Sequence, residues 1–315
     1  MMPEKRMKKL AAVLIALFIF CGTAFASERP AVSITHKLGT VSVPVNPQRV
    51  VVMDFGTLDT LDALSATGAI AVTARLALPK SNLPAYLAKY KGDGYVDVGG
   101  LKEFNLETIN AFKPELIIIS GRQQDYYMEL SSIAPVFFVD NLAADYIATA
   151  HTNILALAAI FDAQEAVAST WDKISQSIAR VREKAAAKNE KALVLLTNDG
   201  KISAYGSGSR FGIIHDDLGV ALADPKIKVG IHGQLVNYEY VAMVNPDIIF
   251  VVDRSAAVGG KADGVRLLDN ALVAKTSAAK NNRIVALDPD FWYLSGGGLR
   301  SLTKMVKDIE EALDK

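Results

Sequence analysis

Arginines at two matching positions are the side chains in this sequence best suited to hold a ligand. Arg122 and Arg254 each close a stretch that runs polar cap, short helix, proline, apolar run, arginine. Asn105, Glu107, Pro114, Ile117 and Arg122 recur at one constant spacing as Asn237, Glu239, Pro246, Ile249 and Arg254. Ligands gather outside the carboxyl ends of parallel strands, and both arginines follow apolar runs. The repeat therefore predicts two guanidiniums at one cleft.

A third arginine, Arg210, stands in the glycine-rich turn Tyr205–Gly212, ahead of an expected helix. Such a turn can also present backbone N–H groups to an anion. Three converging guanidiniums repel one another unless an anion lies among them, so the pattern favours an anionic ligand. For any single arginine the alternative is a solvated side chain or a salt bridge.

Aromatic residues cluster in sequence near the same three arginines. Arginine stacks on aromatic rings, including rings that belong to a ligand. This composition predicts a planar, aromatic, multiply charged anion. The candidate aromatic contacts are Tyr126, Phe211, Tyr238 and Trp292.

The composition limits the function classes. The chain has 315 residues, 50% of them hydrophobic, with 34 Lys and Arg balanced by 34 Asp and Glu. Zero net charge disfavours a general nucleic-acid binder, because such proteins usually carry a basic face. The four histidines form no close pair, and no nucleophile with a partnering base stands out. An exported hydrolase remains as an alternative.

The first 26 residues have the pattern of a signal peptide. Basic residues precede the apolar run Leu10–Gly22, and Ala24-Phe25-Ala26 supplies a cleavage pattern before Ser27. An uncleaved membrane anchor is the alternative. Cys21 is the only cysteine, so a lipoprotein is a further alternative, although the bulky Phe20 precedes it. Export of a chain without other cysteines predicts a periplasmic protein.

Short apolar runs alternate with helical stretches on both sides of a long polar helix at 164–188, which contains no proline or glycine. Strands are predicted at Val50–Met53, Ile70–Thr73, Leu116–Ser120, Val136–Val139, Ala192–Leu196, Ile248–Val252 and Ile284–Leu287. Helices are predicted at Thr57–Ala66, Gln124–Ser131, Arg210–Leu218 and Leu299–Leu313.

We therefore expect an α/β fold of two Rossmann-like lobes with central parallel sheets, joined by one long rigid helix, with the ligand cleft between the lobes. The expected division is an N-terminal lobe at 27–162, a connecting helix at 163–188 and a C-terminal lobe at 189–315. A single doubly wound domain with an accidental repeat is the alternative.

The chain resembles bacterial periplasmic substrate-binding proteins for ferric siderophores, of the two-lobed kind with a single connecting helix. Gly121-Arg122, Gly208–Gly212 and Asp253-Arg254 carry the resemblance, which extends over essentially the whole mature chain. The nearest group is the catecholate binders, for ligands such as enterobactin, vibriobactin or petrobactin. The resemblance implies that the three arginines cradle a ferric catecholate, which is a ligand and not a cofactor. We also expect a monomer.

The resemblance assigns roles to four more residues. His232 and Tyr293 match positions that complete iron coordination when the siderophore is tetradentate; packing roles are the alternative. Glu107 and Glu239 match surface glutamates that dock on the inner-membrane ABC permease, although helix-dipole stabilisation alone would explain them. Another large ligand, such as a hydroxamate siderophore, haem or cobalamin, remains as an alternative with less need of three arginines.

Overall fold

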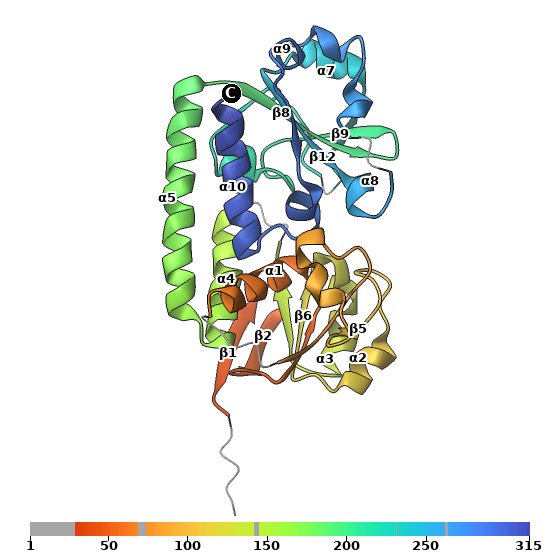
Figure 1. The fold of residues 1–315 in the computed structure, drawn as a ribbon, viewed down its shortest axis with the longest axis vertical. Coiled ribbons are helices and arrows are strands. Elements are labelled where there is room, and N and C mark those ends of the chain that lie inside the picture. Colours follow the sequence, from red (N-terminus) through yellow and green to blue (C-terminus); the bar gives the residue numbers. More distant parts are fainter. Residues whose placement is uncertain (1–28, 69–73, 142–144, 231, 262–263) are drawn as a thin grey trace, which may run out of the picture.

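The computed structural model describes residues 29–68, 74–141, 145–230, 232–261 and 264–315. The expected signal peptide, Cys21 and the strand predicted at Ile70–Thr73 lie outside the described residues. Two lobes are stacked along the long axis, and helix α5 (Gln164–Lys188) runs beside both of them (Figure 1). None of the helices in the described ranges is long and apolar enough to cross a membrane.

The N-terminal lobe is built on a five-stranded parallel sheet of order β5-β4-β3-β6-β7. Its strands are β3 (Arg49–Val52), β4 (Arg75–Leu78), β5 (Val96–Asp97), β6 (Leu116–Ser120) and β7 (Val136–Val139). Helices cover both sheet faces, so strands β6 and β7 are buried along their whole length. This burial explains their uninterrupted apolar runs.

Alternate residues of these strands enter different cores. Ile118 shares one core with helices α1 (Phe55–Ala66) and α4 (Tyr146–Phe161). Its neighbour Ile117 shares the other core with α2 (Leu106–Phe112) and α3 (Tyr127–Ser131).

The lobe also contains the antiparallel hairpin of β1 and β2 and two 3-10 helices: β1 (Ala31–His36), β2 (Gly39–Pro44), η1 (Ala85–Lys91) and η2 (Gly121–Tyr126). Together, η2 and α3 replace the single helix predicted at Gln124–Ser131.

The C-terminal lobe has a six-stranded mixed sheet of order β11-β9-β8-β12-β13, with β10 also paired to β8. Its strands are β8 (Lys191–Asn198), β9 (Lys201–Tyr205), β10 (Ala221–Leu222), β11 (Gln234–Val236), β12 (Ile248–Asp253) and β13 (Ile284–Leu287). The parallel part, β10-β8-β12-β13, agrees with the expected central parallel sheet, whereas β9 and β11 are antiparallel.

The antiparallel strand β9 arises from a tight hairpin that the sequence analysis overlooked. Asp199 and Gly200 connect β8 to β9, and both have positive φ, +49° and +74°. An Asp-Gly pair with this geometry forms the two-residue turn whose twist matches a β-hairpin. The short turn places β9 antiparallel to β8, and both strands line the cleft described below.

The remaining elements of this lobe are mostly short. They are α6 (Ile213–Asp216), α7 (Tyr238–Val244), α8 (Arg254–Ala257), η3 (Arg266–Leu268), η4 (Val273–Lys275), α9 (Ser277–Lys280), the π-helical turn η5 (Asp290–Leu294) and α10 (Leu299–Leu313).

The helix predicted at Arg210–Leu218 is wrong except for α6. The Asp216 carboxylate accepts the Gly208 N–H at 2.7 Å and the Ser207 hydroxyl, which holds residues 206–212 in a compact turn. Gly208 N–H is thus satisfied internally and is not offered to an anion.

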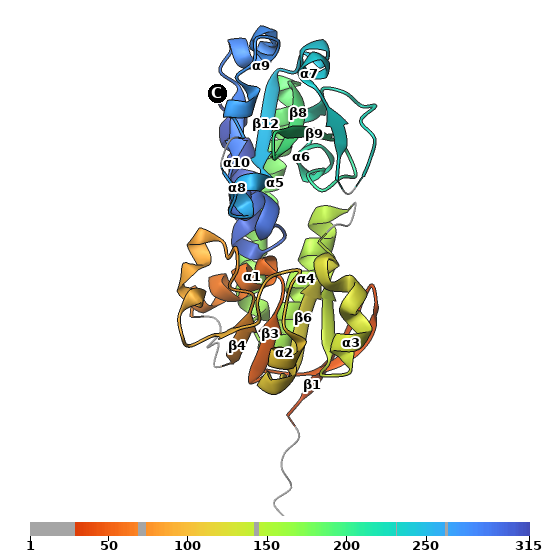
Figure 2. The ribbon, with the colours of Figure 1, turned by 90° about the vertical axis from the view of Figure 1, so that its right-hand side faces the viewer.

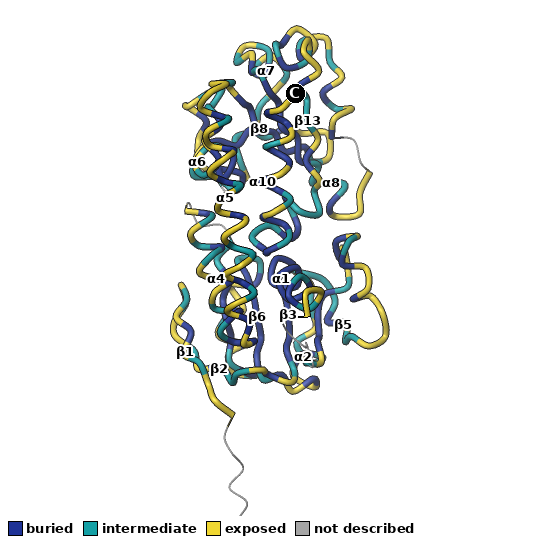
Figure 3. The backbone as a smooth tube through the Cα atoms, turned by 60° about the vertical axis from the view of Figure 1, so that its left-hand side comes forward, coloured by how far each residue is buried: buried dark blue, intermediate teal, exposed yellow. Residues whose placement is uncertain are grey.

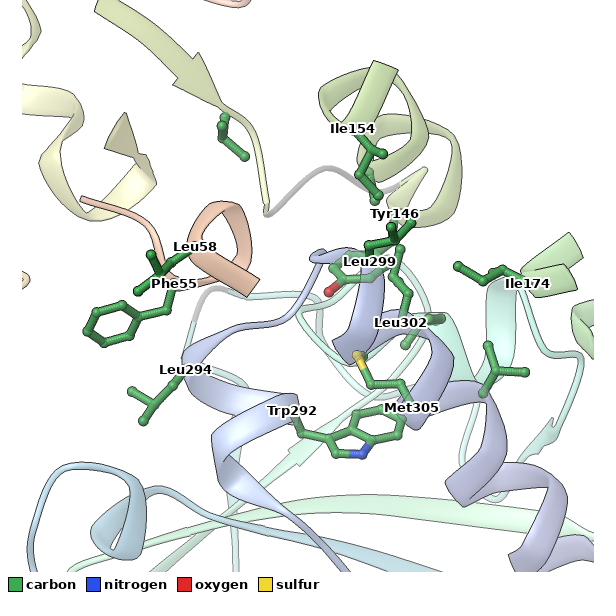
Figure 4. Close-up of a cluster of buried hydrophobic side chains, with 14 of the residues drawn as sticks. Phe55, Leu58, Tyr146, Ile154, Ile174, Trp292, Leu294, Leu299, Leu302 and Met305 are labelled. Carbon is green, nitrogen blue, oxygen red and sulfur yellow. The ribbon is translucent and has the colours of Figure 1, made fainter. Parts of the chain in front are cut away.

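Two long helices and a common core join the lobes. Helix α10 packs against α5 and, at its first turn, against α1 of the N-terminal lobe. Residues of both lobes meet in one buried cluster, with Phe55 and Tyr146 on one side and Trp292 and Met305 on the other (Figure 4). The strands lie inside, whereas much of α5 is exposed along its outer side (Figure 3).

Candidate ligand-binding cleft

Arg122 extends from the N-terminal lobe toward the C-terminal lobe. It lies in η2, directly after β6, where Gln123 fixes the turn: its Oε1 accepts the Ser120 N–H at 3.1 Å and its Nε2 donates to Leu101 O at 2.5 Å. The Arg122 Nη2 donates to the main-chain carbonyl of Tyr293 at 3.0 Å. A residue at the carboxyl end of an N-terminal strand therefore contacts the opposite lobe directly.

Arg210 and Arg254 approach the same tyrosine from the C-terminal lobe. Arg210 Nη2 donates to the Tyr293 carbonyl at 3.0 Å, and its guanidinium carbon lies 4.1 Å from the centre of the Tyr293 ring. Arg254, the first residue of α8, donates from Nε to Tyr293 Oη at 2.9 Å and from Nη1 to Asn198 Oδ1 at 2.6 Å. Helices α6 and α8 lie at the end of this lobe that faces the N-terminal lobe (Figure 2).

Tyr293 is held in place by η5 and its neighbours. The Trp292 indole donates to Asp308 Oδ2 of α10 at 3.0 Å. The Phe291 ring stacks on Tyr86 of the N-terminal lobe with centroids 4.3 Å apart. Asp290 Oδ2 accepts the Ala85 N–H at 2.7 Å. Contacts on both sides of the lobe junction thus fix the group around which the arginines gather.

Arg122, Arg210 and Arg254 form an arginine triad. None of the three has a carboxylate within salt-bridge distance among the residues that the structure describes. Burial lowers the pKa of Arg122 from its ordinary value and the nearby Arg210 lowers it further, and together these outweigh the opposing charges of Asp54 and Tyr293. Burial opposes ionisation of the Tyr293 phenol, but Arg210 and Arg254 outweigh it, so the pKa of Tyr293 lies below its ordinary value. The site therefore favours negative charge, including a phenolate.

The arginines line a cleft of about 590 Å³ between the lobes. Its cationic lining residues are Lys102, Arg122, Lys201, Arg210 and Arg254, against one acidic residue, Asp125. Leu196, Ser203 and Leu235 form a wall from adjoining strands β8, β9 and β11. A second chamber of about 390 Å³ adjoins the first and shares Lys102, Arg122, Arg254 and Tyr293 with it.

His232 lines the larger chamber together with Tyr293, so the two residues matched to iron coordination face the same space. In the described part of the chain, no group of three His, Cys, Asp or Glu residues is placed to hold a metal ion.

The aromatic contacts predicted from sequence lie elsewhere. Phe211 is 1% exposed and packs edge-on against Tyr205 in the core. Trp292 is 3% exposed; it borders only a water-sized gap beside Arg122 and Arg210. Tyr126 packs against Phe104 outside both chambers, and Tyr238 packs against the C-terminal core from α7. Nearness in sequence to an arginine did not give the direction of these side chains.

Glu107 and Glu239 are exposed at equivalent places in the two lobes. Glu107 lies in the first turn of α2, whose N-cap Asn105 accepts the Thr108 N–H at 2.9 Å. Glu239 lies in the first turn of α7, whose N-cap Asn237 accepts the Tyr240 N–H at 2.9 Å. Helices α2 and α7 lie toward opposite ends of the long axis (Figure 1).

Two α/β lobes beside a rigid helix, with a preformed cationic cleft between them, define a solute-binding protein. The chain belongs to the periplasmic binding protein family, which matches residues 50–291. It is 42% identical to the petrobactin-binding protein YclQ of Bacillus subtilis, over 98% of this chain and 100% of that protein. It is 32% identical to the ferric-anguibactin-binding protein FatB of Vibrio anguillarum, over 90% of this chain and 87% of that protein.

Solved structures agree with this assignment. The crystal structure of YclQ matches with a TM-score of 0.86, covering 91% of this chain and 100% of that one. The periplasmic catecholate-siderophore binding protein VctP of Vibrio cholerae matches at 32% identity with a TM-score of 0.82, covering 90% of this chain and 100% of that one. The two-lobed α/β fold expected from sequence is confirmed, and the family is one of binding proteins rather than enzymes.

Proposed function

We propose that this protein captures a ferric catecholate siderophore between its lobes and delivers it to an ABC importer. The observation that carries the proposal is the convergence of Arg122, Arg210 and Arg254 on Tyr293 without a carboxylate partner in the described residues. Iron(III) with three doubly deprotonated catechols carries three negative charges, which three guanidiniums would balance. Relatives named for petrobactin and ferric anguibactin support a siderophore ligand, and one named for catecholate siderophores supports this ligand class.

Other large ligands suit this cleft less well. A ferric hydroxamate, haem or cobalamin carries less negative charge near its metal, so it would leave guanidiniums desolvated without compensation. A catecholate presents anionic oxygens that accept charge-assisted hydrogen bonds, as well as rings on which arginine stacks. The five cationic residues of the larger chamber favour the catecholate.

With a tetradentate siderophore, two coordination positions of iron stay open, and we propose that His232 and Tyr293 fill them. Both line the larger chamber. The arginines around Tyr293 lower the pKa of its phenol despite burial, which favours the anionic oxygen that iron(III) prefers. With a hexadentate siderophore these residues would contact the ligand without binding the metal.

A titration of the ligand-free protein tests the proposal. We expect ferric enterobactin or a ferric bis-catecholate to quench the intrinsic tyrosine and tryptophan fluorescence with a lower Kd than a ferric hydroxamate. The ferric hydroxamate serves as the control for iron and for molecular size. Tighter binding of the hydroxamate than of both catecholates would overturn the assignment.

The remaining parts of the proposal concern export and partners. The leader pattern at residues 1–26 supports secretion to the periplasm, with lipidation at Cys21 as the alternative route. Glu107 and Glu239, exposed on matching helices of the two lobes, would dock on cationic residues of the inner-membrane permease. We expect the protein to act as a monomer.

A further inference from the structure

The second chamber has a different chemistry from the first, although both share one wall. Lys102, Arg122, Arg254 and Tyr293 line both chambers. The larger chamber adds Lys201, Arg210 and His232 to this wall. The smaller adds Ser81, Asn82, Leu101, Glu103 and Val258, with no further cation. Three cations and one acidic residue, Glu103, therefore line the smaller chamber, against five cations and one acidic residue, Asp125, in the larger, so negative charge is favoured more strongly in the larger chamber.

The smaller chamber is bounded by a rigid loop. Gly100 N–H donates to Glu103 O at 2.8 Å, and Gly99 pairs with Phe104 across an isolated bridge. Gly99 has φ +102°, and a Cβ there would come within 2.7 Å of Glu103 O, so a side chain is excluded. The Leu101 carbonyl accepts from Gln123, the neighbour of Arg122. The loop and the arginine are thus fixed relative to each other.

Both lobes contribute to the outer edge of this chamber. Asn82 of the N-terminal lobe lines it, and so does Val258, the C-cap of α8. A Cβ added at Gly259, next to Val258, would lie 3.1 Å from Asn82 Oδ1. The space is therefore a bounded extension of the cleft, with a volume in the range of small-molecule sites.

We infer that the smaller chamber binds the scaffold that links the chelating groups of the siderophore, while the iron chelate occupies the larger one. This inference rests on the proposed function. Ser81 and Asn82 offer hydrogen bonds to amides or hydroxyls of a scaffold, and Leu101 and Val258 offer apolar contact.

Two ferric complexes of equal charge separate the chambers experimentally. One is the bis complex of a simple catecholamide without a linker, and the other is a linear bis-catecholamide joined by an uncharged alkyl diamide. Val258→Trp fills the smaller chamber. We expect this variant to weaken the linked complex at least tenfold and the unlinked complex less than twofold, measured by fluorescence titration. Val265→Trp is the matched control, an exposed valine outside both chambers.

Each outcome decides a separate point. Equal losses for the two complexes, or no loss for the linked one, would overturn the two-chamber assignment while leaving the proposed function intact. Failure of the unmodified protein to bind either complex would overturn both. A loss confined to the linked complex, absent in Val265→Trp, would support the inference.

Discussion

At the scale of single residues, Tyr293 holds the three arginines of the ligand-free cleft in fixed positions. Its carbonyl oxygen accepts from Arg122 and Arg210, and its phenol oxygen accepts from Arg254. Each guanidinium therefore has an oxygen partner, but none forms a salt bridge with a carboxylate in the described residues. The residues that bind an anion are already oriented, so little ordering entropy remains to be lost when the ligand arrives.

Removal of one guanidinium should weaken binding without unfolding the protein. We expect Arg210→Ala to reduce the affinity for a ferric catecholate by ~1–3 kcal/mol, the range of charge-assisted hydrogen bonds. Arg122→Ala and Arg254→Ala should behave alike in the same fluorescence titration. Arg75→Ala is the control, because Arg75 is exposed at the amino end of β4, away from the cleft. Unchanged affinity in all three cleft variants would contradict the role of the triad.

The triad was predictable because its residues stand at recognisable places: two after repeated strands and one in a glycine turn. The structure brings all three together with His232 and Tyr293. Lys102 and Lys201 gave no such signal, since the first lies in an irregular loop and the second after an overlooked hairpin. Phe211 and Trp292 were misassigned because sequence does not show whether an aromatic ring points into a core or a cleft.

At the scale of elements, the first turn of α10 is capped from the other lobe. Asp59 of α1 is 0% exposed, and its Oδ2 accepts the N–H groups of Arg300 and Ser301 at 2.8 and 3.0 Å. Its Oδ1 accepts the Tyr86 hydroxyl at 2.9 Å, and the same hydroxyl oxygen lies 2.7 Å from Ser295 Oγ. This buried network connects α1, η1, η5 and α10, so it fixes the position of Tyr293.

Burial raises the pKa of Asp59 from 3.8 to about 6, in spite of its hydrogen bonds from Ser301, Tyr86 and Arg300 N–H and the charge of Arg300. Because the folded pKa is the higher one, the contribution of Asp59 to stability is fully present below pH 3.8 and is lost as pH rises through about 6. The free energy of unfolding relative to Asp59→Asn should therefore fall by about 2–3 kcal/mol between about pH 4 and 7.5. Denaturant titrations across this range measure it.

The control for this prediction is Asp93→Asn, at an exposed position outside the junction. Its free energy of unfolding should follow the pH profile of the unmodified protein. A profile for Asp59→Asn that also parallels the unmodified protein would contradict the assigned role of Asp59.

The two long helices Gln164–Lys188 and Leu299–Leu313 occur with the predicted bounds, because helical periodicity acts over many residues. The short strands Leu116–Ser120 and Val136–Val139 also occur as predicted, because they are buried along their whole length and are therefore uninterrupted apolar runs. Short elements such as η5 depend on tertiary contacts, here the stacking of Tyr86 on Phe291, which local sequence does not contain. The antiparallel part of the second sheet depends on one two-residue turn.

At the scale of the whole molecule, the shared core and the paired helices α5 and α10 make the lobes a nearly rigid frame. Large hinge closure would break buried contacts of both lobes, so we expect only small rearrangements on binding. A permease must then recognise surfaces whose spacing is nearly constant. Glu107 and Glu239, on matching helices of the two lobes, are placed for such recognition.

The double variant Glu107→Ala with Glu239→Ala separates capture from delivery. Because neither side chain lines the cleft, we expect siderophore affinity to stay within twofold. Uptake of radioactive ferric siderophore by cells should fall roughly tenfold, the effect of losing charge pairs at an interface. Glu165→Ala with Glu183→Ala, two exposed glutamates of α5, is the matched control. Normal uptake in the first variant would show that docking uses other residues.

The hydrogen bonds of Tyr293 also bear on how cargo leaves such a frame. A ligand that recruits the guanidiniums has to compete with the carbonyl and phenol oxygens that hold them beforehand. When the permease withdraws the ligand, the same oxygens can take the donors back. Ligand release is then an exchange of hydrogen-bond acceptors rather than the exposure of three unsatisfied cations. This exchange lowers the free-energy barrier to release and restores the ligand-free arrangement of the arginines.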